Sequence, residues 1–172
     1  MKRLLLITTM FIFFSVQLRA QYHAAVGLRG GKFTSGITAK YFFFPDNASG
    51  IELMLGRTKI AKGGWLGAAF YEHQFPLRIP ILQLPVDFIG GVGVHAGYYP
   101  KRYYKIVEGS AVYYNDKCVS FGMDAIIGLE YLVPIVWLPF AVGIEAQPFV
   151  EFVNQGPEHL DFAITLKYVF ND

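Results

Sequence analysis

The chain has 172 residues, of which 53% are hydrophobic and 17% aromatic. Its length fits one domain, and the apolar content is high for a soluble domain, so part of the surface is expected to face lipid. The lone cysteine, Cys118, excludes an intrachain disulfide and a cysteine-based metal site. Three of the 15 basic residues, Lys2, Arg3 and Arg19, lie in the first twenty positions, and the rest of the chain carries 12 basic and 13 acidic residues, a net charge of −1.

The first predicted element is a secretory signal over residues 1–20. Two basic residues precede an apolar run from Leu4 to Val16, and Ala20 supplies the small residue typical of a cleavage site. The run is shorter than the roughly 20 residues that a membrane-spanning helix needs, which disfavours an anchor. We therefore expect export, cleavage after Ala20 and one mature domain over residues 21–172.

The mature chain alternates apolar and polar residues with a period of two, which is the pattern of β-strands, and no segment has the period of an amphipathic helix. The alternation predicts eight strands that begin near residues 22, 34, 50, 64, 86, 118, 139 and 160. In the first strand Tyr22, Val26 and Leu28 are expected to share the outward face.

The strand near residue 64 is ambiguous. Leu66, Ala68 and Phe70 suggest an outward apolar face, but the same phase directs Glu72 outward. We expect either a β-bulge that resets the phase within residues 65–75 or the opposite register. The strand over residues 119–131 is the clearest of the eight, because its apolar and polar positions alternate with few exceptions.

The longer predicted strands match the roughly 9 to 11 residues of a tilted transmembrane strand. In hydrocarbon all backbone groups must pair within the protein, so such strands have to close on themselves. The sequence therefore predicts an all-β fold: an eight-stranded antiparallel up-and-down transmembrane β-barrel in the outer membrane of a Gram-negative envelope. An even strand number places both termini in the periplasm and the longest connection, Pro100 to Lys117, outside.

Closure of about eight strands leaves an interior that side chains can fill. Ten inward ionisable side chains are expected to form a hydrogen-bonded charge network: Arg29, Lys40, Glu52, Asp87, His95, Asp124, Glu130, Glu145, Asp161 and Lys167. Six are acids, against three bases and one histidine, so the carboxylates need bases, water or protons as partners.

Glycine-rich stretches such as residues 88–97, and a closing strand that ends Lys167-Tyr168-Val169-Phe170, complete the pattern. With them the mature chain resembles the small outer-membrane β-barrel families of the OmpX and OmpA-transmembrane type, in particular the short single-domain barrels of Bacteroidota. The resemblance implies the fold and the location, and it brings no catalytic residue. In such families a final aromatic residue helps the assembly machinery to recognise the last strand, and here two further residues follow Phe170.

Some eight-stranded barrels hydrolyse outer-leaflet lipids with a Ser, His and acid set. The candidates in this chain are Ser120, His95 and either Asp124 or Glu130, all at inward positions of neighbouring strands. No motif joins them, so a structural lumenal histidine is the preferred interpretation. The other histidines lack the spacing of a metal site, and we expect no metal and no cofactor.

Basic residues gather in the predicted extracellular connections. Eight of the 12 mature ones lie there: Lys32, Arg57, Lys59, Lys62, Lys101, Arg102, Lys105 and Lys117. They are candidate contacts for lipopolysaccharide phosphates, while Tyr103 and Tyr104 are candidate anchors for a protein or glycan partner. The competing interpretations are a solvated rim and an aromatic girdle.

The sequence thus favours a non-enzymatic outer-membrane barrel with a side-chain-filled lumen, which acts in envelope integrity or as an accessory subunit of an outer-membrane complex. Its expected partners are outer-membrane lipid, lipopolysaccharide and, in such a complex, another protein, with no nucleic acid. Two alternatives stay open: an outer-leaflet lipid hydrolase, and a narrow pore or small-ligand carrier.

Overall fold

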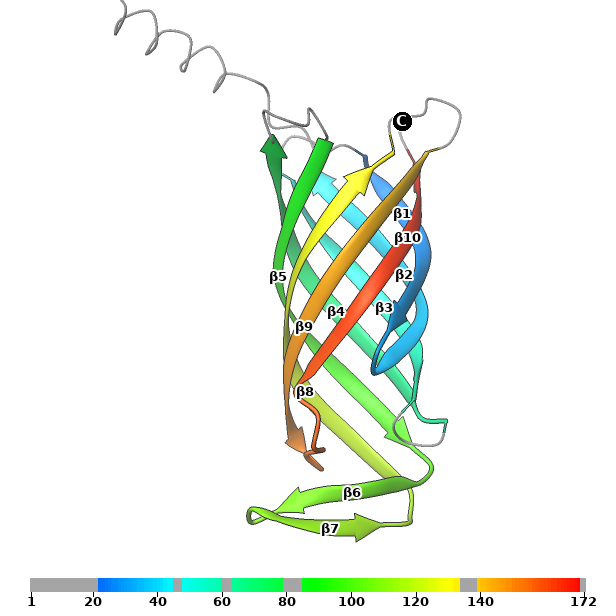
Figure 1. The fold of residues 1–172 in the computed structure, drawn as a ribbon, viewed down its shortest axis with the longest axis vertical. Coiled ribbons are helices and arrows are strands. Elements are labelled where there is room, and N and C mark those ends of the chain that lie inside the picture. Colours follow the sequence, from blue (N-terminus) through cyan, green and yellow to red (C-terminus); the bar gives the residue numbers. More distant parts are fainter. Residues whose placement is uncertain (1–21, 45–47, 60–62, 79–84, 134–138, 171–172) are drawn as a thin grey trace, which may run out of the picture.

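A computed structural model describes residues 22–44, 48–59, 63–78, 85–133 and 139–170, so the predicted signal at residues 1–20 lies outside the described residues. Eight long strands form a wall: β1 Ala24–Gly31, β2 Thr34–Phe44, β3 Ser49–Thr58, β4 Trp65–Arg78, β5 Pro85–Tyr99, β8 Cys118–Leu132, β9 Phe140–Val153 and β10 Leu160–Phe170 (Figure 1). Two short strands, β6 Arg102–Val107 and β7 Ser110–Tyr114, pair only with each other. In the described part of the chain, no helix is long and apolar enough to cross a membrane.

The wall strands form a closed antiparallel barrel in the order β1-β10-β9-β8-β5-β4-β3-β2. Closure is made by β1 on β10, in continuous register from Ala24 opposite Phe170 to Gly31 opposite Ala163. Each strand begins within two residues of its predicted start, so the predicted all-β barrel of eight strands is confirmed. This pairing also brings the start of β1 and the finish of β10 to one end of the barrel, here called the terminus end; the opposite end is the loop end.

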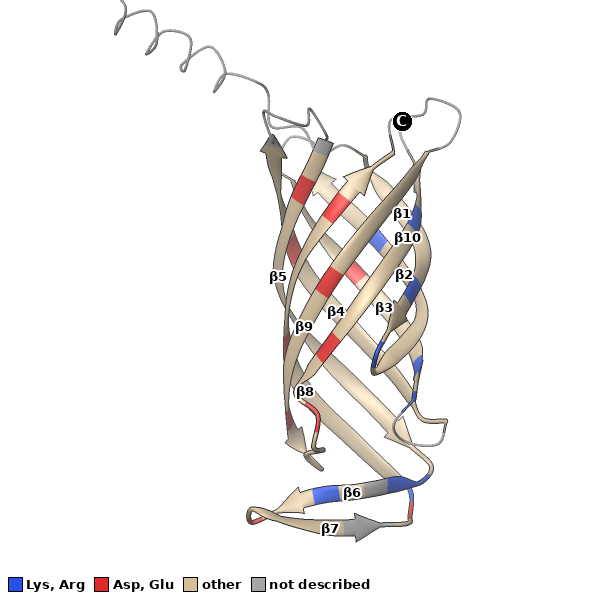
Figure 2. Ribbon diagram, viewed as in Figure 1, with Lys and Arg blue, Asp and Glu red and all other residues tan. Residues whose placement is uncertain are grey.

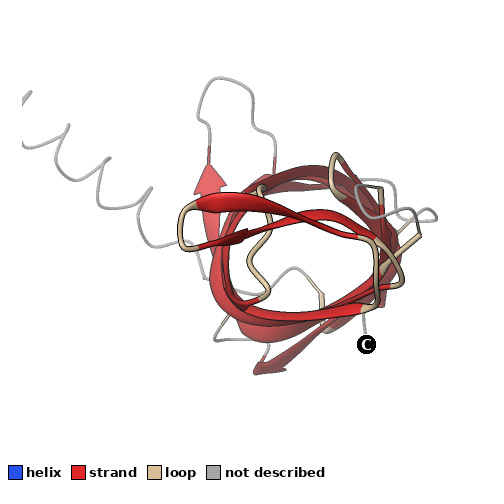
Figure 3. Cartoon of the chain, turned by 90° about the horizontal axis from the view of Figure 1, so that it is seen from below, coloured by secondary structure: helices blue, strands red, loops and turns tan. Residues whose placement is uncertain are grey.

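The β6–β7 hairpin replaces the long loop expected over residues 100–117. It lies across the loop end of the barrel (Figures 1 and 3). Its turn uses Glu108 and Gly109 at φ of 51° and 78°, the paired positive values that tight hairpins favour. A register irregularity between Arg102 and Lys105 interrupts the pairing.

The wall exposes apolar side chains and buries polar ones. On β10, Ile164 and Leu166 are 64% and 48% exposed, whereas their neighbours Thr165 and Lys167 are at most 1% exposed. The same alternation runs along β3, β8 and β9. The wall is therefore apolar on its outer face and directs its charged side chains inward, the reverse of the usual arrangement in a soluble protein.

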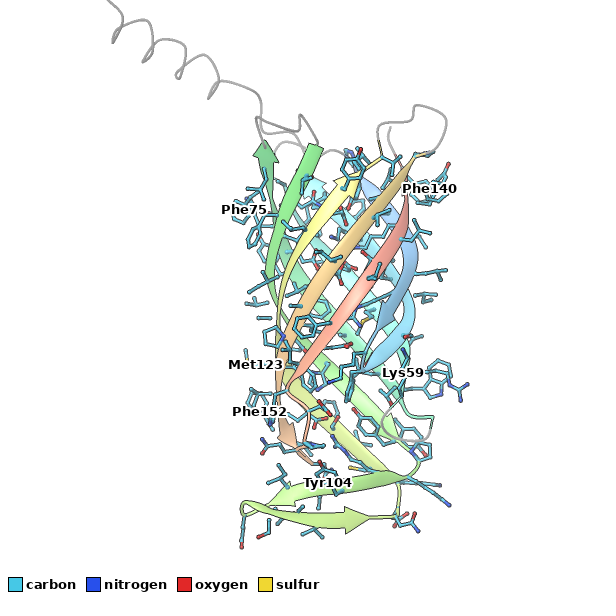
Figure 4. The ribbon with its side chains drawn as sticks, in the orientation of Figure 1. Lys59, Phe75, Tyr104, Met123, Phe140 and Phe152 are labelled. Carbon is cyan, nitrogen blue, oxygen red and sulfur yellow. The ribbon has the colours of Figure 1, made fainter. Side chains whose placement is uncertain are left out.

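Aromatic and thioether side chains continue this outer surface toward both ends. Figure 4 shows Phe75 and Phe140 pointing away from the barrel near the terminus end, and Met123 and Phe152 pointing away from it nearer the loop end. Phe152 is 66% exposed and Met123 54%. These outward apolar side chains, here called the apolar belt, therefore extend over most of the height of the wall.

Strand β4 adopts the opposite register, without a bulge. The inward side chains are Leu66, Ala68, Phe70, Glu72 and Gln74, none more than 7% exposed. Trp65 and Tyr71 point outward at 49% and 55% exposed, and β4 pairs with both neighbours without a register shift. Of the two expected outcomes, the opposite register is therefore confirmed and the bulge within residues 65–75 is not found. The physical reason for this register is Glu72, whose carboxylate meets Lys40 Nζ at 2.8 Å inside the barrel.

Candidate functional site

The ten side chains expected in the lumen are all buried, each at most 5% exposed. They are Arg29 on β1, Lys40 on β2, Glu52 on β3, Asp87 and His95 on β5, Asp124 and Glu130 on β8, Glu145 on β9, and Asp161 and Lys167 on β10. With Glu72 on β4, every wall strand contributes at least one charged side chain, and Figure 2 shows these charges spread over the wall strands. The barrel therefore holds a candidate site built by the whole sheet.

Two lysines organise the part of the network nearer the terminus end. Lys40 Nζ lies 3.0 Å from Glu52, 2.8 Å from Glu72 and 3.7 Å from Glu130. Lys167 Nζ shares two of these acids, at 3.1 Å from Glu52 and 3.2 Å from Glu130. Because both ammonium groups contact more than one carboxylate, the cluster is a connected group and not a set of separate pairs.

Arg29 continues the network toward the loop end. Its guanidinium lies 2.9 Å from Asp161 and 3.4 Å from Glu145, and it donates to Gln147 Oε1 at 2.9 Å. Glu145 also contacts Lys167 Nζ at 3.3 Å, which joins the arginine to the lysine cluster. Charge-assisted bonds of this kind are stronger than neutral ones, so the lumen is held by linked ionic contacts from β1 to β10.

The histidine of the predicted hydrolase set has an acid partner but no serine partner. His95 Nδ1 lies 2.8 Å from Asp124, whose other oxygen accepts a bond from Gln147 Nε2 at 2.9 Å. His95 Nε2 and Ser120 Oγ are both buried and form no hydrogen bond with each other. The ring of Phe149 packs edge-on to the imidazole at 5.5 Å. A nucleophilic site needs the base within reach of the hydroxyl, and here the described contacts of the imidazole are with Asp124 and Phe149.

Several polar residues of the network were not among the ten, Gln147 included. Glu72 and Gln74 come from the reversed register of β4, and Gln74 Nε2 donates to Glu130 at 2.9 Å. Tyr22, expected outward with Val26, is instead 4% exposed, and its hydroxyl donates to Glu130. A bend at His23 shifts the phase before β1 begins, and this is why alternation along β1 gave the wrong face for Tyr22.

Apolar side chains fill the rest of the lumen. At the terminus end, Phe42 and Val169 are at most 1% exposed and pack in one cluster with Tyr22. Farther along, a second cluster joins Phe33, Met54, Leu66, Ala68, Phe70, Ile126 and Phe149. Inward glycines make room for the large neighbours: a Cβ on Gly27 would lie 2.6 Å from the Lys167 Cα. The interior is thus packed with side chains, as an eight-stranded barrel allows.

At the loop end an arginine ties the hairpin to the barrel. Arg102, on β6, is 6% exposed, and one of its nitrogens lies 2.6 Å from Glu151 Oε2. The guanidinium also donates to the Asn154 carbonyl and lies 4.6 Å from the centre of the Tyr99 ring. We call Arg102, Glu151, Asn154 and Tyr99 the loop-end cap. Glu151 is a buried acid that was not among the ten, although it continues the inward phase of Glu145 and Gln147 on β9.

The predicted outer contacts fall into separate groups. Arg102 is paired with Glu151 in the loop-end cap, and Lys105 Nζ donates to Asn154 Oδ1 at 3.4 Å. Lys101 is exposed and Lys59 donates to the Gly31 carbonyl, while Lys62 lies outside the described residues and Tyr103 and Tyr104 lie in β6. Among the described side chains of this set, Arg102 and Lys105 meet at Asn154, whereas Lys59 bonds to the β1–β2 turn, so these three do not form one patch.

Eight acids and four bases are buried in the described part of the barrel, together with His95. The acids are Glu52, Glu72, Asp87, Asp124, Glu130, Glu145, Glu151 and Asp161; the bases are Arg29, Lys40, Arg102 and Lys167. Within the described residues no group of three or more His, Cys, Asp or Glu side chains is placed to hold a metal ion. No protein-family model and no curated protein matches the chain, so the resemblance to small outer-membrane barrels stays a prediction.

Proposed function

We propose that this protein is a non-enzymatic integral outer-membrane β-barrel whose packed lumen excludes solutes, and that it acts in envelope integrity, alone or as an accessory subunit of an outer-membrane complex. The observation that carries the proposal is the reversed polarity of a closed sheet. Its outward positions are apolar, and its buried charged side chains all point into the barrel. Both the apolar outer face and the closed sheet suit a lipid bilayer. The apolar side chains can contact hydrocarbon, and closure leaves no unpaired backbone edge in it.

The belt can be tested with a charge placed at two exposed apolar positions. Ile164 lies in the wall at 64% exposed, and Val112 lies in the β6–β7 hairpin at 43% exposed. If the wall faces lipid, Ile164→Arg costs about 2–4 kcal/mol of unfolding free energy near the bilayer midplane. Val112→Arg, outside the wall, should cost less than about 0.5 kcal/mol. The measurement is urea unfolding of both variants in phosphatidylcholine vesicles, and equal costs would count against lipid exposure of the wall.

The closed lumen has its own test. Purified wild-type barrel in planar bilayers should give no discrete conductance steps, because paired ions and apolar clusters fill the interior. Stable single-channel openings by the intact protein would favour the pore alternative.

The hydrolase alternative has a separate test. Phospholipid and lipopolysaccharide profiles that stay unchanged on overexpression would argue against the hydrolase alternative, whereas new deacylated products would support it.

The two proposed roles, a free-standing envelope protein and an accessory subunit, differ in which molecules should co-purify with the barrel. Mild-detergent purification of the tagged protein from native membranes, followed by mass spectrometry, should recover either lipopolysaccharide alone or a stoichiometric protein as well. The first result supports a free-standing envelope protein and the second an accessory subunit. A deletion strain with an unaltered permeability barrier, together with no co-purifying protein, would contradict both versions.

A further inference from the structure

Three exposed basic residues lie on neighbouring segments at one corner of the loop end. Arg57 closes the outward face of β3, and its guanidinium lies 5.5 Å from the centre of the Trp65 ring on β4. Lys59 follows β3 and donates from Nζ to the Gly31 carbonyl at 2.7 Å; Figure 4 shows it beside the lower end of the barrel. Lys32, next to Gly31, is exposed in the turn between β1 and β2. We call Lys32, Arg57, Lys59 and Trp65 the basic corner.

The backbone that carries the basic corner is fixed by hydrogen bonds. Lys59 N donates to the Phe33 carbonyl at 2.9 Å, which joins the β3–β4 connection to the β1–β2 turn. Lys32 N donates to the Phe162 carbonyl at 2.8 Å, and Arg57 is paired with Ser35 in the sheet. The backbone that presents these charges is therefore fixed, so binding has to order side chains but no loop.

None of the three basic side chains forms an ion pair within the described residues. Of the 11 acids in the described part, eight are buried in the barrel and three, Glu108, Asp116 and Glu158, lie in the loop-end connections. The basic corner differs in this respect from Arg102, which Glu151 neutralises. Its positive charge is left for a ligand from outside the chain.

On the outer surface of the barrel, the basic corner lies next to an apolar part of the wall. Leu53 and Leu55 occupy the same outward face of β3 as Arg57, at 55% and 50% exposed. Tryptophan prefers the level of the lipid headgroups, so Trp65 marks that level. We propose that the basic corner binds the phosphate of an anionic lipid in the leaflet at the loop end. Arg57 supplies a planar fork for two phosphate oxygens, and the lysines supply point charges. This inference rests on the proposed membrane location and adds a ligand class and a site to it.

The test compares two pairs of charge-removing substitutions. Wild type, Arg57→Gln/Lys59→Gln, and Lys101→Gln/Lys117→Gln are each reconstituted in nanodiscs of phosphatidylcholine and phosphatidylglycerol at 4:1, and retained lipids are counted by native mass spectrometry after release. Both pairs remove the same charge, but Lys101 and Lys117 are exposed outside the basic corner. Each neutralised corner charge should lower the phosphatidylglycerol preference about fivefold. The control pair should keep the wild-type preference within about twofold.

Equal loss in both pairs would overturn the site in favour of diffuse attraction, and no preference in inserted wild type would overturn it outright. A parallel sample with 50 mM inorganic phosphate distinguishes the source of the anion, since displacement of the lipid would assign the corner to free phosphate and overturn the lipid proposal. Failure of wild type to enter any bilayer is a different result, because it removes the membrane location itself.

Discussion

Replacement of Lys167 by methionine keeps much of the side-chain volume and removes one charge from the centre of the lumen. The ammonium contacts Glu52, Glu130 and Glu145 at 3.1 to 3.3 Å and the residue is 0% exposed. Removal of one partner from a buried pair typically costs about 3–5 kcal/mol. All three acids keep a second base, because Lys40 contacts the first two and Arg29 contacts Glu145. The expected loss is therefore at the lower limit, about 3 kcal/mol, or roughly a hundredfold in the unfolding equilibrium.

The assay is equilibrium urea unfolding in phosphatidylcholine vesicles, followed by tryptophan fluorescence. An unchanged dependence of the unfolding free energy on urea concentration would show that the variant unfolds in the same way as wild type. Lys117→Met is the matched control, since Lys117 is exposed in the loop-end connection and its replacement should change stability by less than about 0.5 kcal/mol. Adding Glu145→Gln to Lys167→Met should recover part of the loss, because it removes an acid that the lysine had neutralised. A Lys167→Met barrel as stable as Lys117→Met would refute the view of the lumen as a dry, mutually dependent ion network.

Further outcomes follow from packing and from the cap. Gly122→Ala should cost at least about 2 kcal/mol in the same unfolding assay, because its Cβ would lie 2.4 Å from the His95 ring; Gly30→Ala, where the nearest atom is 3.9 Å away, should be nearly neutral. Arg102→Ala removes a charge-assisted bond of about 2 kcal/mol and should accelerate chymotrypsin cleavage in the β6–β7 hairpin by at least tenfold. Glu151→Gln should accelerate the cleavage less, since the amide can still accept the bond, and equal rates in all three proteins would count against the cap.

Alternation alone was enough to predict the barrel, because a strand with one lipid face and one lumenal face repeats its chemistry at every second residue. The prediction from alternation worked best where polar and apolar positions are chemically distinct. On β10, for example, Asp161 and Lys167 point inward while Ile164 points outward. The ten lumenal positions named from this pattern are all buried in the structure. What the pattern cannot encode is which charge meets which, since the partners are set by strand order and stagger around the barrel.

The ambiguity of β4 has a physical cause. The lumen of this barrel has an apolar part, so Leu66 and Phe70 are inward beside Met54 and Phe149, and hydrophobicity no longer separates the two faces of β4. Glu72 was the informative residue, because an unpaired carboxylate facing hydrocarbon is far more costly than a buried leucine. At the loop end, the inward series from Glu145 and Gln147 runs on past Pro148 to Glu151, and following that phase would have identified the acid of the cap.

Every wall strand supplies at least one charged side chain to the lumen, and this constrains the order in which the barrel can assemble. Arg29 on β1 and Asp161 on β10, 132 positions apart, meet only when the first and last strands pair. A partly formed, open sheet would offer both unpaired backbone and unneutralised ions to the hydrocarbon. In the membrane location proposed above, closure of the β1–β10 seam also completes the ion pairs of Arg29, so insertion of this chain should be all-or-none, with the unclosed sheet held at the water interface until its last strand arrives.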